Sequence, residues 1–435
     1  MKTKSLIIII LIFDLAFSEP YQTKYFDQLI DHLGFETGDK TFKQKYLIKD
    51  DYYRYDKGPI LFYCDNEAPV EFSFGGAGFM HTTLAKELNA LVVFMEHRYF
   101  GGLSPLAQKK NLLRKEIINT LLKSLGCEDN ECPIVVFGAS YGGMLSAWIR
   151  MKFPKIIDAS LASSTPIFLY ENREGVDETL FFKVVTDTYD QNGCSKQIHS
   201  AMKILTGLIG SPLPSFLFKK QYKKVLDEIN QGMKTCKPIT DQNNLNVLRT
   251  YIDSAYGYMS MFNYHKKVIL FQRCLLGLQT ILAVKKFVDV YYDFEEQKKC
   301  IHFNTGSTGD VNTSGYKILS CADIVQPIHP NGITDMFYNQ PWDKDLYQQY
   351  CEETFGLTPS YDYVLNFYGG KNDDEMNDDL TIINMYAAGH CSDLRLSQIG
   401  DVERVIQARI EEEKYIKRWI QEKLPSDYFT KKSQV

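Results

Sequence analysis

The chain has 435 residues, of which 44% are hydrophobic, 24% charged and 13% aromatic. This composition excludes a disordered, collagen-like or small disulfide-scaffold protein, and the length suffices for one large domain or two to three ordinary ones. Lysine and arginine together number 49 against 54 acidic residues, for a net charge of −5, so we expect no basic surface and no nucleic-acid partner.

The first eighteen residues have the layout of a secretory signal peptide. Two lysines precede the apolar run 6–13, and small residues follow at Ala16 and Ser18, after which we expect cleavage. A membrane anchor is the alternative, but a span needs about 20 apolar residues and this run is shorter. The mature chain is therefore expected to have no membrane span and to be secreted or held in a lysosomal or vacuolar lumen.

An oxidising compartment makes disulfide bonds the expected state of the cysteines. Cys127 and Cys132 could close a small loop of their own. The other six candidates, whose pairing the sequence leaves open, are Cys194, Cys236, Cys274, Cys300, Cys321 and Cys351. Zinc is the alternative, but no C-x-x-C or H-x-x-x-H spacing occurs, so neither a metal site nor a cofactor is predicted. The sequon at 312–314 predicts glycosylation of Asn312.

Apolar strands and helices alternate in the first part of the mature chain. The runs 60–63, 91–95 and 134–137 are continuous and apolar, as in strands buried on both faces. Segments 112–125 and 144–153 have the character of helices. Buried strands separated by helices indicate an α/β fold with a mostly parallel sheet.

After Pro166 strand-like runs become few and the sequence has mainly the periodicity of helices. We expect a helical cap insertion over 167–320, with helices at 268–277 and 281–291, between two parts of one α/β domain at 19–166 and 321–435.

The second part of the α/β domain is expected to hold a last strand at 380–386 and to end in a helix. Segment 363–367 is also strand-like. The apolar face predicted for the terminal helix consists of Val402, Val405, Ile406, Ile410, Ile416, Trp419 and Ile420.

The strongest chemical signal is the sequence Gly-Ala-Ser-Tyr-Gly at 138–142, between the expected strand 134–137 and the expected helix 144–153. A G-x-S-x-G turn in that setting is a nucleophile elbow, which lifts the Ser140 hydroxyl clear of the sheet. The amide of Tyr141, at the start of the helix, is placed to stabilise an oxyanion. An ordinary glycine-rich turn is the alternative, and a phosphate-binding loop is excluded because no Gly-Lys-Ser/Thr follows.

The catalytic base is predicted from the order Ser, acid, His that this kind of fold uses along the chain. Of the eight histidines, His390 alone lies just past the expected final strand. A neutral imidazole there can accept the Ser140 proton and return it to the leaving group.

The orienting acid is predicted in the acidic segment 369–379. Asp373 is the first choice, because it follows the strand-like segment 363–367 after a glycine turn; the other candidates are Asp374, Asp378 and Asp379. A solvated acidic loop is the alternative interpretation. The acid would fix the imidazole tautomer and stabilise the imidazolium.

With these motifs the chain resembles the serine carboxypeptidase family of lysosomal Pro-X carboxypeptidase, dipeptidyl peptidase II and thymus-specific serine peptidase. The resemblance covers nearly the whole mature chain, through the segments 25–32, 41–46, 58–67, 96–101, 142–154, 335–337, 368–370 and 389–395. It implies an α/β-hydrolase fold with an inserted helical cap, and hydrolysis of peptides next to proline through an acyl-enzyme. It also implies a second oxyanion amide near Asn66, a bracing role for Glu96-His97-Arg98, and a homodimer as a plausible state.

The chain also departs from the family. The Asn-Gly-x-x-Asp-Pro-Trp type motif that carries the catalytic acid lacks its Pro and Trp here, and Cys391 stands where a second histidine is common. In one alignment Asp373 is the acid; in another the acid-bearing strand and loop are missing, which the short spacing from Asp373 to His390 favours. Two alternatives therefore stay open beside the peptidase, namely an impaired family member that acts as a binding protein and a lipase or esterase. Carboxypeptidase and dipeptidyl-peptidase activity are not distinguished.

Overall fold

The computed structural model describes most of the chain after the N-terminal segment. The described residues are 21–30, 40–54, 57–98, 100–101, 115–127, 131–191, 193–209, 216–262, 281–293, 297–303, 311–369, 380–386, 388–426 and 428. The predicted signal peptide, the predicted helix 268–277 and Asp373 lie outside these ranges.

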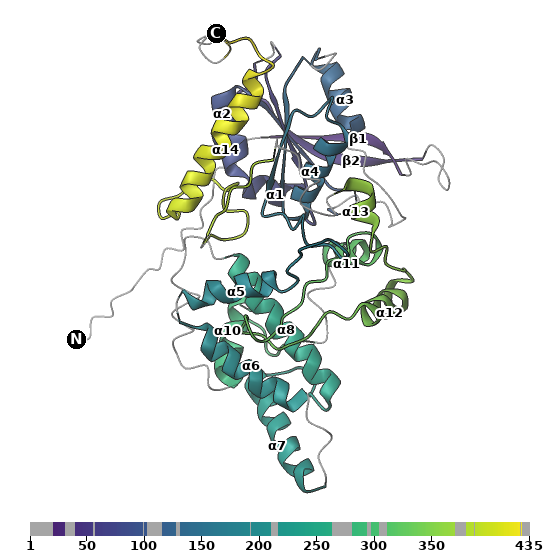
Figure 1. Ribbon diagram of the computed structural model, residues 1–435, viewed down its shortest axis with the longest axis vertical. Coiled ribbons are helices and arrows are strands. Elements are labelled where there is room, and N and C mark those ends of the chain that lie inside the picture. Colours follow the sequence, from purple (N-terminus) through teal and green to yellow (C-terminus); the bar gives the residue numbers. More distant parts are fainter. Residues whose placement is uncertain are drawn as a thin grey trace, which may run out of the picture.

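A six-stranded sheet forms the centre of the α/β part (Figure 1). Its spatial order is β1-β2-β4-β3-β5-β6, in which β3 to β6 are parallel to one another and β2 is antiparallel to both of its neighbours, β1 and β4. The strands are β1 (Gln22–Leu29), β2 (Thr41–Lys49), β3 (Ile60–Cys64), β4 (Leu91–Met95), β5 (Ile134–Ala139) and β6 (Ala159–Ser163). The mostly parallel α/β sheet and its three predicted strands are confirmed.

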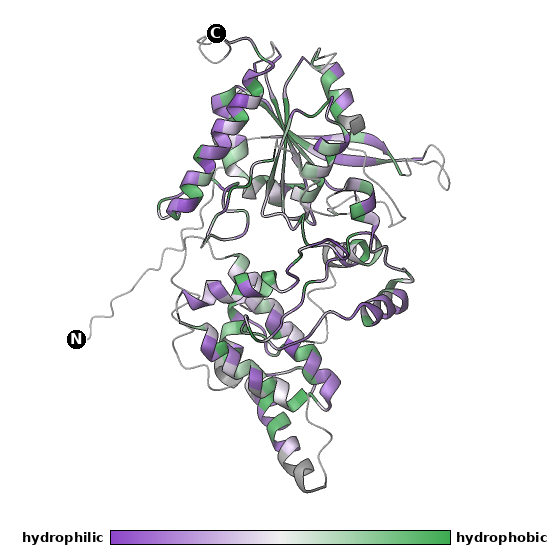
Figure 2. Cartoon of the chain, viewed as in Figure 1, coloured by the Kyte–Doolittle hydropathy of each residue, from purple (hydrophilic) through white to green (hydrophobic). Residues whose placement is uncertain are grey.

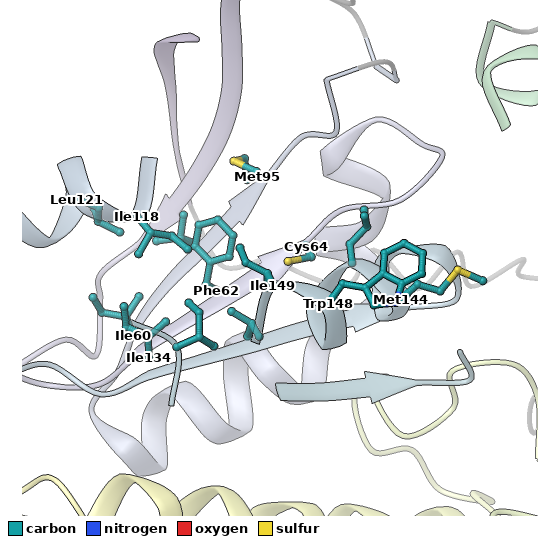
Figure 3. Close-up of a cluster of buried hydrophobic side chains, with 14 of the residues drawn as sticks. Ile60, Phe62, Cys64, Met95, Ile118, Leu121, Ile134, Met144, Trp148 and Ile149 are labelled. Atoms are coloured by element: carbon teal, nitrogen blue, oxygen red, sulfur yellow. The ribbon is translucent and has the colours of Figure 1, made fainter. Parts of the chain in front are cut away.

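Alternate side chains of the central strands enter two separate cores, because successive residues of a strand point to opposite faces. Ile60, Phe62 and Cys64 face one core with Met144 and Trp148 (Figure 3), and their neighbours Leu61 and Tyr63 face the other. Because both faces of these strands are buried, their sequences are continuous apolar runs.

Helices cover both faces of this sheet (Figure 1). Three helices pack into the core of Ile60 and Phe62, namely α3 (Lys115–Ser124), α4 (Tyr141–Lys152) and α13 (Tyr363–Tyr368). Four helices pack into the core on the opposite face, namely α1 (Val70–Gly76), the π-helix η1 (Phe79–Leu84), α2 (Ala85–Leu88) and α14 (Glu403–Gln421). This three-layer arrangement around a parallel sheet is that of an α/β-hydrolase.

A second, helical part has a core of its own. It contains α5 (Leu180–Asp190), α6 (Ser195–Ile209), α7 (Phe216–Met233), α8 (Gln242–Met261) and α10 (Ile281–Tyr292), which pack around fully buried residues such as Tyr256 and Phe287. Asp241 caps α8 by accepting a 2.8 Å hydrogen bond from the backbone amide of Asn244. Met336 and Phe337, which follow later in the chain, also pack in this core.

Two further helices, α11 (Val311–Ala322) and α12 (Lys344–Phe355), connect the helical part to the sheet and are joined by the Cys321–Cys351 disulfide. The pairs Cys127–Cys132 and Cys236–Cys300 are also bonded, and so is Cys194. The expected disulfide state is thus confirmed for these cysteines. In the described part of the chain, no helix is both long and apolar enough to cross a membrane.

Three expectations for the second half of the chain are wrong. Residues 363–367 lie in helix α13, because Val364, Leu365 and Tyr368 face the core at helical spacing and Tyr368 stacks on Trp148. Residues 380–386 form no strand, since the segment pairs with no neighbouring strand and leaves Leu380 and Ile382 more than half exposed.

The third correction concerns the face of α14, whose amphipathic character is visible in Figure 2. Ile406 and Ile410 are exposed, although we expected them on the buried face. Arg409 and Glu412 are buried in their place. Apolar periodicity failed here because the protein uses this face of the helix for polar contacts.

Candidate active site

Ser140 stands at a sharp turn between β5 and α4, as the elbow prediction requires. Its backbone has φ 55° and ψ −123°, a left-handed conformation that a non-glycine residue adopts only under constraint. A Cβ on Gly138 would lie 2.0 Å from the carbonyl oxygen of Gly142, and one on Gly142 would lie 2.4 Å from that of Cys64. The two glycines of the motif are therefore required for the turn to form.

The two residues predicted for the oxyanion hole lie beside this turn. Tyr141 opens α4, and the first backbone amides of a helix point toward the space in which an oxyanion can be held. Asn66 follows β3, and its Cβ is 3.4 Å from the position that a Cβ on Gly142 would take. The Asn66 side-chain oxygen accepts a 3.0 Å hydrogen bond from Ser73 Oγ, which fixes the loop against α1.

The segment Glu96-His97-Arg98 packs behind the elbow. His97 Nε2 lies 3.1 Å from the Tyr141 hydroxyl, Glu96 forms a 2.8 Å ion pair with Lys45, and Arg98 donates to the carbonyls of residues 29 and 30. These contacts tie the segment to α4, β1 and β2.

His390 lies in a turn that we name the histidine loop, residues 388–395. Its backbone amide donates a 2.7 Å hydrogen bond to the carbonyl of Met261, the last residue of α8. Desolvation lowers the pKa of the imidazole from 6.5 to about 4, because burial disfavours the charged form. The ring is thus neutral above about pH 4 and able to accept a proton.

Ser140 and the histidine loop are both bonded to residues 163–165, which we name the linking segment. The carbonyl of Ser163 accepts from the Ser140 amide at 2.9 Å, and Thr165 Oγ1 donates to the Ser140 carbonyl at 2.8 Å. Ser164 Oγ accepts from the Cys391 amide at 2.9 Å. Three consecutive residues therefore contact the turn that carries Ser140 and the residue that follows His390.

Asp393 connects the same loop to the linking segment and to α14. Ser163 Oγ donates to its carboxylate at 2.6 Å, while Arg409 donates to the carbonyls of Ser392 and Asp393 at 2.7 and 3.0 Å. Burial and the charge of Asp393 raise the pKa of Glu412 well above its usual value. With Glu412 protonated, the two buried carboxyl groups share a hydrogen bond.

Glu67 lies in the loop 65–67 after β3, which we name the oxyanion loop, and two tyrosines from α8 and α11 lie near its carboxylate. Burial raises the pKa of Glu67, which follows Asn66 and is hydrogen-bonded to it. Burial, and then the charge of Glu67, raise the pKa values of Tyr258 on α8 and Tyr316 on α11. The Tyr316 ring meets that of Tyr141 edge-on, with centroids 5.8 Å apart. An aromatic residue of α11 therefore contacts Tyr141 at the start of α4.

Sequence reasoning missed most of the residues that hold the site together. Ser163, Arg409 and Glu412 carried no signal, because their contacts join segments that are far apart along the chain. Asp373 lies outside the described residues, so its contact with His390 stays a prediction. Asn312 belongs to α11, and its glycosylation also stays a prediction.

One group in the described part of the chain has the residue types of a metal site. Cys236, Cys300 and His302 have ligand atoms within 4.8 Å of one another. The two cysteines form a disulfide, and their sulfurs are therefore not available as thiolate ligands.

The chain is similar to known peptidases. The profile of the serine carboxypeptidase S28 family matches residues 28–377. The lysosomal Pro-X carboxypeptidase of Mus musculus is 29% identical over 462 aligned positions, which cover 94% of this chain and 91% of that protein. The protein of that name from Homo sapiens is 28% identical, over 94% of this chain and 90% of its own length. The thymus-specific serine protease of Homo sapiens is 32% identical over 33% of this chain and 30% of that protein.

The match to the family profile begins near the end of β1 and includes the oxyanion loop, the elbow and the helical part. The alignment with the Mus musculus protein has 462 positions against the 435 residues of this chain, so that relative contains segments that this chain lacks. The profile nevertheless covers most of the sequence. The chain therefore belongs to the serine carboxypeptidase S28 family, a family of serine peptidases.

Proposed function

We propose that this protein is a serine exopeptidase that hydrolyses peptides next to proline through an acyl-enzyme. The observation that carries the proposal is the strained Ser140 backbone, which is bonded to the same three-residue segment as the histidine loop. Similarity to Pro-X carboxypeptidases over nearly the whole chain supports the substrate class.

The mechanism follows from the positions of these groups. Ser140 Oγ attacks the scissile carbonyl carbon while the neutral His390 ring takes its proton. The amides of Tyr141 and Asn66 donate to the oxyanion of the tetrahedral intermediate. His390 then protonates the leaving amine, the C–N bond breaks, and water releases the acyl group from Ser140 by the same steps.

The third member of the triad is proposed as Asp373. Its carboxylate would accept from the far ring nitrogen of His390 and stabilise the imidazolium. The other possibility is that the acid-bearing segment has been lost. Support for a loss comes from the length of the Mus musculus alignment, which exceeds that of this chain, and from the end of the family match at residue 377.

The helical part is proposed as a cap, over 167–320, that restricts access to Ser140. A cap of this kind admits short or terminal peptide segments, which is a physical reason for exopeptidase behaviour. Tyr258, 39% exposed on the last turn of α8, is a candidate platform for the substrate, since flat aromatic rings pack well on pyrrolidine rings.

The site of action is proposed as a lysosomal or similar lumen, or the cell exterior. Disulfide bonds support an oxidising environment, and the similar Pro-X carboxypeptidase of Mus musculus carries a lysosomal name. Cleavage after Ser18, glycosylation at Asn312 and a homodimer belong to the same proposal.

The proposal is tested with the purified full chain and two peptide substrates. One has a blocked amino end, a penultimate proline and a free carboxylate; the other has a free amino end, proline second and a chromogenic amide. Hydrolysis of either one, absent in Ser140→Ala, supports the proposal and identifies which peptide end is read. Hydrolysis of a short-chain ester but of neither peptide would contradict it and favour an esterase.

A catalytically impaired protein that binds peptides is the second candidate function. The observation that favours it is the set of segments that the Mus musculus relative has and this chain lacks, together with the absence of a strand at 380–386. Loss of the acid alone typically lowers the rate about 10⁴-fold and leaves the nucleophile in place. Peptide binding measured by calorimetry, with hydrolysis that slow, would support this function.

A further inference from the structure

Ser163 occupies a position that touches both catalytic segments. Its carbonyl accepts from the Ser140 amide at 2.9 Å, and its hydroxyl donates to the Asp393 carboxylate at 2.6 Å, three residues after His390. Ser163 ends β6, the strand that pairs with β5 and so with the strand that delivers Ser140. Strand pairing thus fixes the backbone of Ser163, and the hydrogen bond to Asp393 fixes its side chain.

We propose that Ser163 and Asp393 are positioning residues that set the distance and orientation of His390 relative to Ser140. This inference rests on the proposed roles of Ser140 and His390 and names the residues through which those roles depend on the fold. Neither residue is proposed to touch the substrate.

Two further sets of hydrogen bonds hold the backbone around His390 in a fixed position relative to the Asp393 side chain. Arg409 holds the carbonyls of residues 392 and 393 and is itself bonded to Asp401 at 2.6 Å. Inside the loop, Ser392 Oγ donates to the Gly389 carbonyl at 2.7 Å. A shift of the Asp393 carboxylate is therefore transmitted to the backbone on both sides of His390.

The proposal implies a loss of rate without a matching loss of substrate affinity. Removing the Ser163 hydroxyl leaves its carbonyl in place but leaves the buried Asp393 carboxylate without that donor, so the loop relaxes away from the elbow. Misplacement of a catalytic group by about 1 Å can lower a rate about 100-fold. We expect Ser163→Ala to lower kcat by about 10- to 100-fold, with KM within about 2-fold of the wild type.

A matched control lies on the same strand. Ser160 Oγ donates to Ser146 Oγ on α4 at 3.2 Å, so its hydroxyl bonds to a helix of the sheet rather than to the histidine loop. We expect Ser160→Ala to lower the melting temperature about as much as Ser163→Ala while kcat stays unchanged.

Asp393 supplies a second pair of variants, in case Ser163→Ala fails to fold. Asparagine keeps an acceptor for Ser163 and offers an N–H to Glu412, whereas alanine removes both. We expect Asp393→Asn to keep kcat within about 3-fold of the wild type and Asp393→Ala to lose about 100-fold.

The readouts are kcat, KM, melting temperature and the rate constant for labelling of Ser140 by a fluorophosphonate. Equal kcat and labelling rates in Ser163→Ala and Ser160→Ala, or in Asp393→Ala and Asp393→Asn, would overturn the positioning role. A wild-type protein that the probe does not label would overturn this inference and the proposed nucleophile together. Labelling without hydrolysis of proline peptides would reject the substrate class alone and leave the positioning role supported by the labelling rates.

Discussion

The hydroxyl of Ser163 donates a 2.6 Å hydrogen bond to the carboxylate of Asp393, 230 residues further along the chain. This bond joins the end of β6 to the loop that carries His390, while the carbonyl of Ser163 accepts from the Ser140 amide. We therefore infer that the relative placement of the proposed nucleophile and base depends on a residue that takes no part in the chemistry.

The elbow glycines give the first prediction. Gly138→Ala and Gly142→Ala should each abolish fluorophosphonate labelling, because the added Cβ would lie 2.0 and 2.4 Å from a carbonyl oxygen. Gly207→Ala in α6 is the control, since a Cβ there meets no atom within 4 Å and alanine favours a helix by about 1 kcal/mol. Labelling kinetics and melting temperature measure both effects; normal labelling of Gly138→Ala would show that the turn differs from the one described.

The pH dependence of activity gives the second prediction. The pKa of His390 is lowered to about 4, so the ring is a neutral base above that pH and loses function as it is protonated below it. The acid limb of the kcat/KM profile should therefore fall near pH 4 rather than near 6.5. Because the folded-state pKa is depressed, the associated stability is present above about pH 6.5 and is lost as pH falls through about 4. An acid limb between pH 6 and 7 would contradict the burial of this imidazole.

The buried carboxyl pair gives the third prediction, with the opposite sign. The pKa of Glu412 is raised by burial and by Asp393, so the folded state holds a proton that the unfolded state releases above its ordinary value of 4.5. The stability from this group is present below pH 4.5 and is lost as pH rises through the folded-state pKa. Between acidic and neutral pH, the melting temperature of Glu412→Gln should therefore fall less than that of the wild type. Parallel curves for the two proteins would rule the effect out.

Removal of disulfide bonds gives the fourth prediction. The Cys236–Cys300 bond closes 64 residues and the Cys127–Cys132 bond closes five, so loop entropy predicts losses of about 4 and about 2 kcal/mol. Paired serine variants, unfolded in denaturant, test this order. A larger loss for the short loop would show that contacts other than chain entropy dominate.

The last prediction concerns Tyr258. If its ring supports the substrate, Tyr258→Ala should raise KM for a proline peptide about 10-fold, while Tyr258→Phe, which keeps the ring, should behave like the wild type. Steady-state kinetics of both variants provide the comparison. Equal KM values in the two variants would place the substrate elsewhere.

The parts of this fold that depend on short segments were predictable from the sequence. The apolar runs at β3, β4 and β5 are buried on both faces, and five residues around Ser140 suffice to specify the elbow. The change to helix-periodic sequence after Pro166 predicted the helical insertion, and the order of the triad along the chain predicted His390 as the base.

The parts that depend on distant partners were not predictable. Segment 380–386 is rich in apolar residues and was expected to be a strand, but a strand needs a neighbour, and this segment pairs with none. The buried face of α14 was misjudged because Arg409 and Glu412 are held there by contacts to the histidine loop rather than by apolar packing. No pattern within α14 itself reveals those partners.

The most direct test of the central claim is peptide mass spectrometry of the full chain after reaction with a fluorophosphonate. We predict a single covalent adduct on Ser140, formed at least about 100-fold more slowly in His390→Ala and absent in Ser140→Ala. An adduct on a different residue, or an adduct rate that is unchanged in His390→Ala, would contradict the assignment of Ser140 as nucleophile and His390 as its base.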